Sequence, residues 1–244
     1  MTLPKPKNIL THSSAVGLFD KKEAAEFIVE GCRHVHSSIL GQKDPLVKTT
    51  YQSLEETKVF TYSWESTEKK KQLFLRSSSQ RKEILNELLS HLEVKPQSSL
   101  GDRVGTAFEE LLTNSIFHSY LDTNKLEKYP RNQVAHLDSS EHIAIEFCRS
   151  NQGVFVSVRD YGQGLKFSSI QSSFKRCYSQ RDESQVEKKL GGAGLGMFVI
   201  FELATHLKIV TFPGKGTLTN CWFAPASAFD PNHFSFNFFE GDKP

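Results

Sequence analysis

The stretch FEELLTNSIFHSY, residues 108–120, combines the pattern of a core helix with a row of polar side chains. Its apolar and small residues recur at steps of three and four, which places them on one face of a helix: Phe108, Leu111, Leu112, Ser115, Ile116 and Ser119. Glu110, Asn114 and His118 are also four residues apart, so their side chains form a row along the same helix. Such a row is either a solvated helix edge or a carboxylate, an amide and an imidazole that face a ligand.

The composition is that of an ordinary soluble globular protein. The chain has 244 residues, of which 38% are hydrophobic and 24% are charged, enough for one sizeable domain with an appendage or for two small domains. Lys and Arg number 30 and Asp and Glu number 28, so a net charge of +2 provides no strong basic field for nucleic acid. The four cysteines are far apart and are read as reduced thiols rather than as zinc ligands.

Neither a leader sequence nor a membrane span is expected. The N-terminal MTLPKPKNILTHSS lacks the apolar core of a signal peptide. No stretch of the sequence approaches the roughly 20 apolar residues that a membrane-spanning helix needs. We therefore expect a cytoplasmic protein that binds neither nucleic acid nor a membrane.

Hydrophobic periodicity predicts the order of the elements. Helices are expected over residues 20–40, with Asp20 as N-cap and Gly41 as stop, over 80–94, with Ser79 as cap, over 108–120, and from Met197 onwards. Strands are expected over 72–76, 142–148, 154–160, 207–212 and 216–223. Connectors or loops are expected over 42–70, 121–140 and 165–190.

This order predicts an α+β fold: a two-layer sandwich with helices on one face of a mixed, mostly antiparallel sheet. The other face of the sheet is expected to be free for solvent or a partner. Three parts are expected along the chain: an N-terminal helical segment and connector, a compact domain, and a tail whose phenylalanines dock on another surface. Their bounds are 1–68, 69–226 and 227–244.

Two glycine-containing segments have the chemistry of a ligand site. Asp160-Tyr161-Gly162-Gln163-Gly164 ends a predicted strand, where a carboxylate can accept hydrogen bonds and two glycines let the backbone approach a flat ligand. Asp and Gly are equally common in ordinary turns, so this segment alone is weak evidence.

The second segment contains Gly191, Gly192, Gly194 and Gly196 and opens a predicted helix. Glycines before a helix N-terminus form a cradle for anions, because bare amides and the helix dipole both point at the ligand. No GK[ST] follows, and no acidic residue lies about 20 residues further on, so neither a P-loop nor a dinucleotide fold is indicated. The alternative is close packing of the helix on the sheet.

Taken in order along the chain, these segments resemble the GHKL nucleotide-binding fold (the Bergerat ATP-binding fold). It is shared by gyrase, heat-shock chaperone ATPases, histidine kinases and anti-sigma-factor kinases. FEELLTNSIFHSY is similar to the asparagine box of anti-sigma serine kinases, and VRDYGQGL and LGGAGLGM are similar to the two glycine boxes. GKGTLTNCWF resembles the final strand, so the resemblance covers roughly residues 70–225.

The resemblance implies ATP and Mg²⁺ as cofactors. Asn114 would hold Mg²⁺ through its amide oxygen, and Glu110 would act as general base or orient the attacking group. Asp160 would accept a hydrogen bond from the adenine amino group. The other positions implied around the nucleotide are Gly162, Gly164, Gly192, Gly194, Leu195, Gly196 and Thr217. For His118 a structural imidazole is expected rather than a catalytic one.

Two positions depart from the family pattern. Phe117 stands where many histidine kinases have a phosphate-contacting Lys, and Gly192 stands where anti-sigma kinases have an Arg. Lys188 or Lys189 is the candidate substitute as a point charge. We expect ATP binding to survive these changes, whereas efficient phosphotransfer is the weaker expectation.

The resemblance implies a stand-alone ATP-binding regulator of the anti-sigma type in bacterial signalling. It would be a Ser/Thr protein kinase, a weak ATPase or a nucleotide-dependent partner switch. A non-catalytic ATP-dependent binding module and an orphan histidine kinase ATPase domain are the alternatives. The expected protein partner is a sigma factor, an anti-sigma antagonist or a response regulator, and a homodimer is left open.

Two related classes are not expected. SHLEVKP, residues 90–96, is superficially similar to a histidine kinase phosphoacceptor box. His91 precedes Asn114 by only 23 positions, too few for the rest of a dimerisation hairpin. A gyrase-like or chaperone-like machine needs a transducer domain after the ATPase, and about 20 residues follow Phe223.

Overall fold

The structure, a computed structural model, describes residues 9–11, 14–37, 70–150, 153–179, 195–225, 230 and 234–241. The strands are β1 (Ile9–Thr11), β2 (Ser14–Gly17), β3 (His34–Ser37), β4 (Lys71–Leu75), β5 (Ile143–Ser150), β6 (Gly153–Asp160), β7 (His206–Phe212), β8 (Gly216–Phe223) and β9 (Ser235–Glu240). The helices are α1 (Lys21–Val29), α3 (Arg81–His91), α4 (Ser99–Thr113), α5 (Phe167–Ser179) and α6 (Gly196–Leu203). A 3₁₀ turn, η1 (Ser78–Gln80), precedes α3, and a π-helical turn, η2 (Asn114–His118), continues α4.

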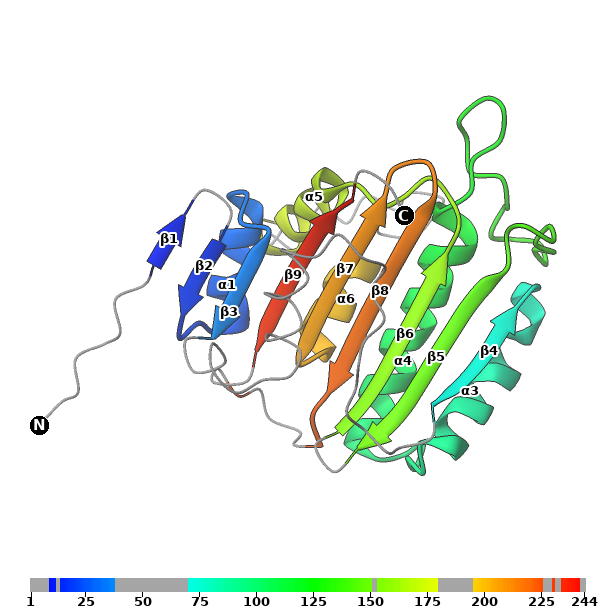
Figure 1. The fold of residues 1–244 in the computed structure, drawn as a ribbon, viewed down its shortest axis with the longest axis horizontal. Helices are drawn as coiled ribbons and strands as arrows, with labels where there is room; N and C mark the ends of the chain where they lie inside the picture. Colours follow the sequence, from blue (N-terminus) through cyan, green and yellow to red (C-terminus); the bar gives the residue numbers. More distant parts are fainter. Residues whose placement is uncertain are drawn as a thin grey trace, which may run out of the picture.

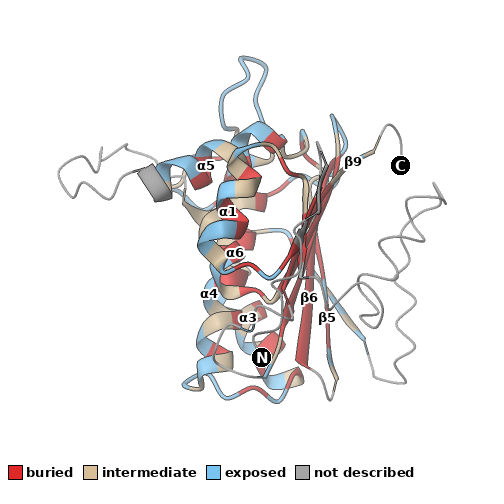
Figure 2. Ribbon diagram, turned by 90° about the vertical axis from the view of Figure 1, so that its left-hand side faces the viewer, coloured by how far each residue is buried: buried red, intermediate tan, exposed pale blue. Residues whose placement is uncertain are grey.

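The described strands form one nine-stranded sheet in the order β1-β2-β3-β9-β7-β8-β6-β5-β4. Six neighbouring pairs are antiparallel, and β2–β3 and β7–β9 are parallel. The described helices cover one face of this sheet, as Figures 1 and 2 show. The predicted two-layer α+β fold with a mixed, mostly antiparallel sheet is therefore confirmed.

The central strands are buried on both of their faces. On the helix side, Leu207 and Ile209 of β7 belong to the main hydrophobic core. On the opposite side, Lys208 is 4% exposed and Trp222 of β8 is 6% exposed. The expectation that this face is free for solvent is therefore wrong for the central strands.

The predicted helix over residues 20–40 ends earlier than expected. Asp20 is its N-cap, as predicted, and forms a capping box with Glu23. The helix ends at Val29, because Gly31 has a φ of +113°, which reverses the chain after the cap. The chain then enters β3, which pairs with β2 and β9. The expected stop at Gly41 and the expected connector up to residue 69 lie outside the described residues.

Two segments predicted as irregular are regular elements. Within the expected loop 165–190, residues 167–179 form α5, while residues 180–190 lie outside the described part. Within the expected tail 227–244, residues 235–240 form β9, which inserts between β3 and β7. Phe234, Phe236 and Phe238 are buried in the core of this same sheet.

The helix predicted from the 108–120 stretch starts earlier and ends in a wider turn. Ser98 caps it through a hydrogen bond that its hydroxyl accepts from Gly101, 3.1 Å away. The α-helical part ends at Thr113, and Asn114 begins η2. Likewise, the predicted cap at Ser79 is wrong, because Ser77 caps η1 before α3 begins. In the described part of the chain, none of the helices has the length and apolarity needed to cross a membrane.

Candidate functional site

A cavity of about 770 Å³ lies between α4, η2, the end of β6, α5 and the start of α6. Its size is in the range of small-molecule sites. The predicted site residues that line it are Glu110, Asn114, Asp160, Gly164, Leu195, Gly196 and Thr217. His118, expected to have a structural role, lines it as well. The row formed by Glu110, Asn114 and His118 therefore faces a cavity that is large enough for a ligand.

The other predicted glycines, Gly162, Gly192 and Gly194, are not among the residues that line the cavity in the described part of the chain. A Cβ atom at Gly162 would lie 2.0 Å from the backbone oxygen of Ser119, so only glycine lets the β6 end pack this closely on the helix end. Gln163 strengthens this contact by donating its backbone N–H to the Ser119 oxygen, 2.8 Å away. Gly192 and Gly194 lie outside the described residues.

Asp160 is a buried carboxylate at the wall of the cavity, with 5% of its surface exposed. Its Oδ1 atom accepts hydrogen bonds from the backbone nitrogens of Gly162, at 3.1 Å, and Thr217, at 3.3 Å. Burial raises the pKa of this carboxyl to about 6, while hydrogen bonds from Gly162, Ser119 and Thr217 act in the opposite direction. The side chain is thus fixed in place and partly dehydrated.

Thr217 reaches the cavity because the register of the sheet pairs it with Asp160 across β6 and β8. Its hydroxyl accepts a hydrogen bond from the backbone nitrogen of Leu165 at 2.9 Å. Thr217 therefore links the loop after β6 to β8 at the wall of the cavity.

The start of α6, which also lines the cavity, lies against the polar row of α4. A Cβ atom at Gly196 would lie 2.4 Å from Oε2 of Glu110 and 3.3 Å from Oδ1 of Asn114. A carboxylate oxygen and an amide oxygen thus both lie close to the backbone of Gly196. Oxygen donors of this kind, few in number, suit Mg²⁺, which keeps water and phosphate as its other ligands. Among the described residues, no group of three or more His, Cys, Asp or Glu side chains could hold a metal ion by itself.

Sequence reasoning missed part of the lining. One wall comes from α5 and the residue before it, with Lys166, Ser169, Ile170, Ser173 and Arg176. Their steps of three and four residues are those of one helix face, a signal that the polar composition of this segment conceals. Arg131 and Leu121 come from the irregular segment between η2 and β5, where periodicity gives no signal.

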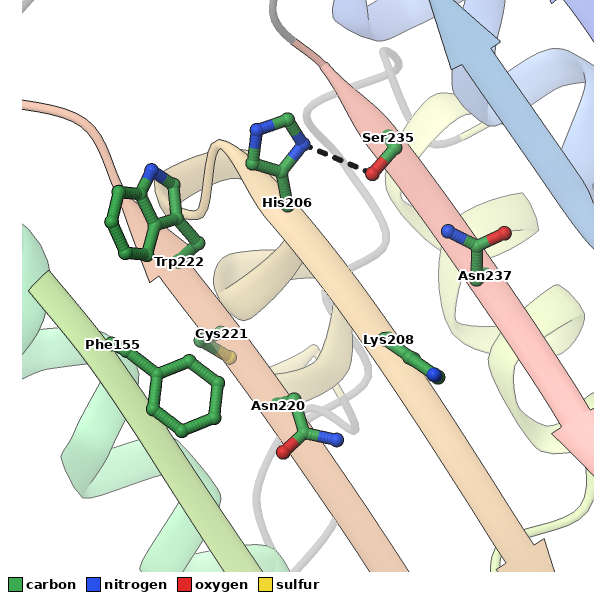
Figure 3. A pocket seen from close by; sticks show the side chains of 8 residues that line it. All are labelled: Phe155, His206, Lys208, Asn220, Cys221, Trp222, Ser235 and Asn237. Atoms are coloured by element: carbon green, nitrogen blue, oxygen red, sulfur yellow. Dashed lines mark hydrogen bonds between the residues drawn. The ribbon is translucent and has the colours of Figure 1, made fainter. Parts of the chain in front are cut away.

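Another cavity lies on the sheet face opposite the helices, and Figure 3 shows the side chains around it. His206 there shares a hydrogen bond of 3.0 Å with the hydroxyl of Ser235. The volume is only about 10 Å³, the space of a single small molecule such as water. Of these two cavities, only the one beside Asn114 and Asp160 can take a ligand of nucleotide size.

Comparison with known proteins agrees with this geometry. Residues 100–226 match the family described as histidine kinase-, DNA gyrase B-, and HSP90-like ATPase. The phosphate regulon sensor protein PhoR of Pseudomonas aeruginosa is 31% identical over 99 residues, which is 39% of this chain and 22% of that protein. The sensor histidine kinase MtrB of Mycolicibacterium paratuberculosis is 35% identical over 85 residues, 34% of this chain and 15% of that protein.

A further relative is the sensor histidine kinase MtrB of Mycobacterium leprae, 35% identical over 103 residues, which is 39% of this chain and 18% of that protein. The chain therefore matches about a fifth of the length of these relatives. The family match covers more than half of the chain, and it contains Glu110, Asn114, Asp160, Gly196 and Thr217. The chain belongs to the histidine kinase-, DNA gyrase B- and HSP90-like ATPase family.

Proposed function

We propose that the chain binds ATP together with Mg²⁺ in the cavity of about 770 Å³ and passes the terminal phosphoryl group to a protein side chain. The observation that carries this proposal is that Asn114 and Asp160, 46 positions apart in the sequence, line the same cavity. Family membership supports the nucleotide, and the oxygen donors beside Gly196 support the metal.

Asp160 would recognise the base. Its Oδ1 atom is already used by two backbone N–H groups, and the carboxylate lies at the cavity wall. A carboxylate can accept further hydrogen bonds, and the exocyclic amino group of adenine is a donor that guanine does not have at the same place. The proposal therefore includes a preference for adenine over guanine nucleotides.

Asn114 and Glu110 would act at the phosphate end. The amide oxygen of Asn114 would hold Mg²⁺, which would supply positive charge to neutralise the phosphates. Glu110, one turn earlier on α4, would accept the proton of the attacking group or orient that group. Gly196 would bring the backbone at the start of α6 close to both side chains, as its position against their oxygen atoms supports.

Two kinds of side chain are candidates to receive the phosphoryl group. The matched relatives are named as sensor proteins and sensor histidine kinases, which favours a histidine acceptor. His91 is not proposed as that acceptor, because its ring packs on Phe147 with centroids 5.3 Å apart. The similarity of residues 108–120 to anti-sigma serine kinases favours a Ser or Thr hydroxyl on a partner, and this is the second candidate.

Binding and phosphotransfer need separate tests. Binding is measured as a thermal shift and by calorimetry with ATP plus Mg²⁺, with GTP as the matched control. Transfer is measured with γ-labelled ATP, the chain and candidate partner proteins. A phosphohistidine is lost in acid and kept in base, whereas phosphoserine and phosphothreonine behave in the opposite way, so the stability of the label identifies the acceptor.

Each outcome has a clear meaning. Binding with labelling of a partner supports the proposed kinase. Binding without labelling of any partner would reject the kinase and leave a nucleotide-dependent partner switch as the function. An absence of binding at millimolar ATP would reject the nucleotide site itself.

A further inference from the structure

The segment between η2 and β5, residues 119–142, brings a cation to the cavity. Arg131 lines the same cavity as Glu110 and Asn114. The segment is tied down near this point by Lys128, whose Nζ atom donates to Oδ2 of Asp138 at 2.6 Å and to both carboxylate oxygens of Glu141 at 2.9 Å. Arg131 is therefore held at the cavity by an anchored segment.

The guanidinium of Arg131 is oriented by two further side chains. Its Nη2 group contacts Nε2 of His118, and Nδ1 of His118 lies 2.5 Å from Oε1 of Glu127. These contacts are satisfied together when Nδ1–H donates to the carboxylate and Nε2 accepts from the guanidinium. The imidazole ring of His118 is therefore held between Glu127 and Arg131.

Arg131 has no direct carboxylate partner in the described part of the protein. Among the described residues, its Nε atom is buried without a hydrogen-bond partner. A buried donor without an acceptor is costly, and a guanidinium binds the two oxygens of a phosphate or carboxylate in a forked geometry. An anion in the cavity would satisfy both requirements.

The turn η2 itself contains no Lys or Arg that could contact a phosphate. Phe117 is the residue three positions after Asn114, and it is 5% exposed and packed in the core. We propose that Arg131 binds a phosphate oxygen of the nucleotide and that His118 is the positioning residue that aims it. This inference rests on the proposed function, because it names a further residue of that same site.

The test separates the phosphate from the base. Calorimetry on the full chain compares adenosine, AMP, ADP and ATP, the last two with Mg²⁺, in wild type and in Arg131→Gln. Loss of a charge-assisted hydrogen bond should lower the affinity for ATP by about tenfold or more. Affinity for adenosine should stay at the wild-type value, because adenosine has no phosphate.

Two control variants accompany Arg131→Gln. Lys125→Gln removes a charge from the same segment at an exposed position that does not line the cavity, and it should bind ATP as the wild type does. Arg176→Gln removes another cation of the lining, contributed by α5. If ATP affinity falls in Arg176→Gln and stays unchanged in Arg131→Gln, the assignment of Arg131 is rejected.

The positioning role of His118 predicts a pattern that a merely structural role does not. His118→Leu should lower ATP affinity and leave adenosine affinity unchanged, and His118→Gln, which can accept from Arg131, should recover part of the loss. Equal loss of both ligands in His118→Leu would overturn the positioning role. Wild-type protein that binds none of the four compounds would reject the proposed function, whereas wild-type ATP affinity in Arg131→Gln rejects only this inference.

Discussion

The Oδ1 atom of Asp160 accepts a hydrogen bond from the backbone nitrogen of Thr217, 3.3 Å away and 57 residues later in the chain. This bond joins the end of β6 to β8, whose register already pairs these two residues. The carboxylate that we propose for base recognition is therefore positioned by the sheet itself, and not by a flexible loop.

The first prediction concerns Asp160→Asn. The Nδ2 group of an Asn would place a hydrogen-bond donor opposite the amino group of adenine, which is also a donor. The hydrogen bond would be lost, so we expect ATP affinity to fall by about tenfold or more. Calorimetry and the ATP-induced thermal shift measure this loss. Asp102→Asn, at an exposed position of α4, is the matched control and should bind ATP normally. Wild-type affinity in Asp160→Asn would contradict the base-recognition role.

The second prediction concerns pH. The folded-state pKa of Asp160, about 6, is above the reference value of 3.8, so its stabilising contribution is complete below the lower value and is lost as pH rises through the higher one. Asn does not titrate. Between about pH 4 and about pH 7, the stability of Asp160→Asn relative to wild type should therefore increase, by up to roughly 3 kcal/mol.

Urea denaturation without nucleotide, repeated across this pH range in both proteins, measures the difference. Other carboxyl groups titrate in both proteins, so their contributions to the free energy of unfolding cancel in the comparison. A difference that does not change with pH would show that the carboxyl of Asp160 titrates in the folded protein as it does in the unfolded chain.

The third prediction concerns the metal. In Asn114→Ala the proposed Mg²⁺ ligand is missing, so the gain in ATP affinity on adding Mg²⁺ should shrink by about tenfold. Adenosine affinity, which needs no metal, should not change. Titrations of ATP with and without Mg²⁺ in both proteins test this expectation, and a full Mg²⁺ effect in the variant would exclude Asn114 as a ligand.

The fourth prediction separates binding from chemistry. Glu110→Gln keeps the size and the hydrogen-bonding capacity of the side chain but removes a base. We expect ATP affinity close to that of wild type and a loss of turnover of about 100-fold. Phosphate release or partner labelling measures turnover, and unchanged turnover would remove Glu110 from the mechanism.

The fifth prediction concerns the last strand. Phe236 of β9 is fully buried, and its ring lies 6.2 Å from that of Phe201 in α6. Phe236→Ala should lower the free energy of unfolding by about 3–5 kcal/mol, because it leaves a cavity in the core. Phe239→Ala, at a half-buried position of the same strand, should cost clearly less. Equal, small losses in both variants would contradict the position of β9 in the sheet.

The pattern of residues predicts the part of the fold that rests on local periodicity. The five strands expected from alternation appear as β4 to β8, and the polar row of Glu110, Asn114 and His118 faces the cavity. The segments around Asn114 and Asp160 follow one another in the order of a known family, and this order alone indicates that both residues belong to one site.

The missed elements depend on distant contacts. The helix α5 has a polar, serine-rich sequence, and its helical state rests on tertiary packing, in which Phe167 contacts Phe238 with ring centroids 5.1 Å apart. The strand β9 pairs in parallel with β7, a partner whose identity no local pattern reveals. Arg131 was missed for the same reason, since its place beside His118 is set by the path of an irregular segment.

The position of β9 has a consequence for the order in which the strands of the sheet can pair. The three N-terminal strands reach the rest of the sheet only through β9, which is the last described strand of the chain. The edge of β3 therefore gains its neighbour only when β9, which is distant from it in the sequence, has joined the sheet. Contacts between segments that are far apart in a sequence form slowly, and removal of β9 would leave both β3 and β7 without their shared neighbour.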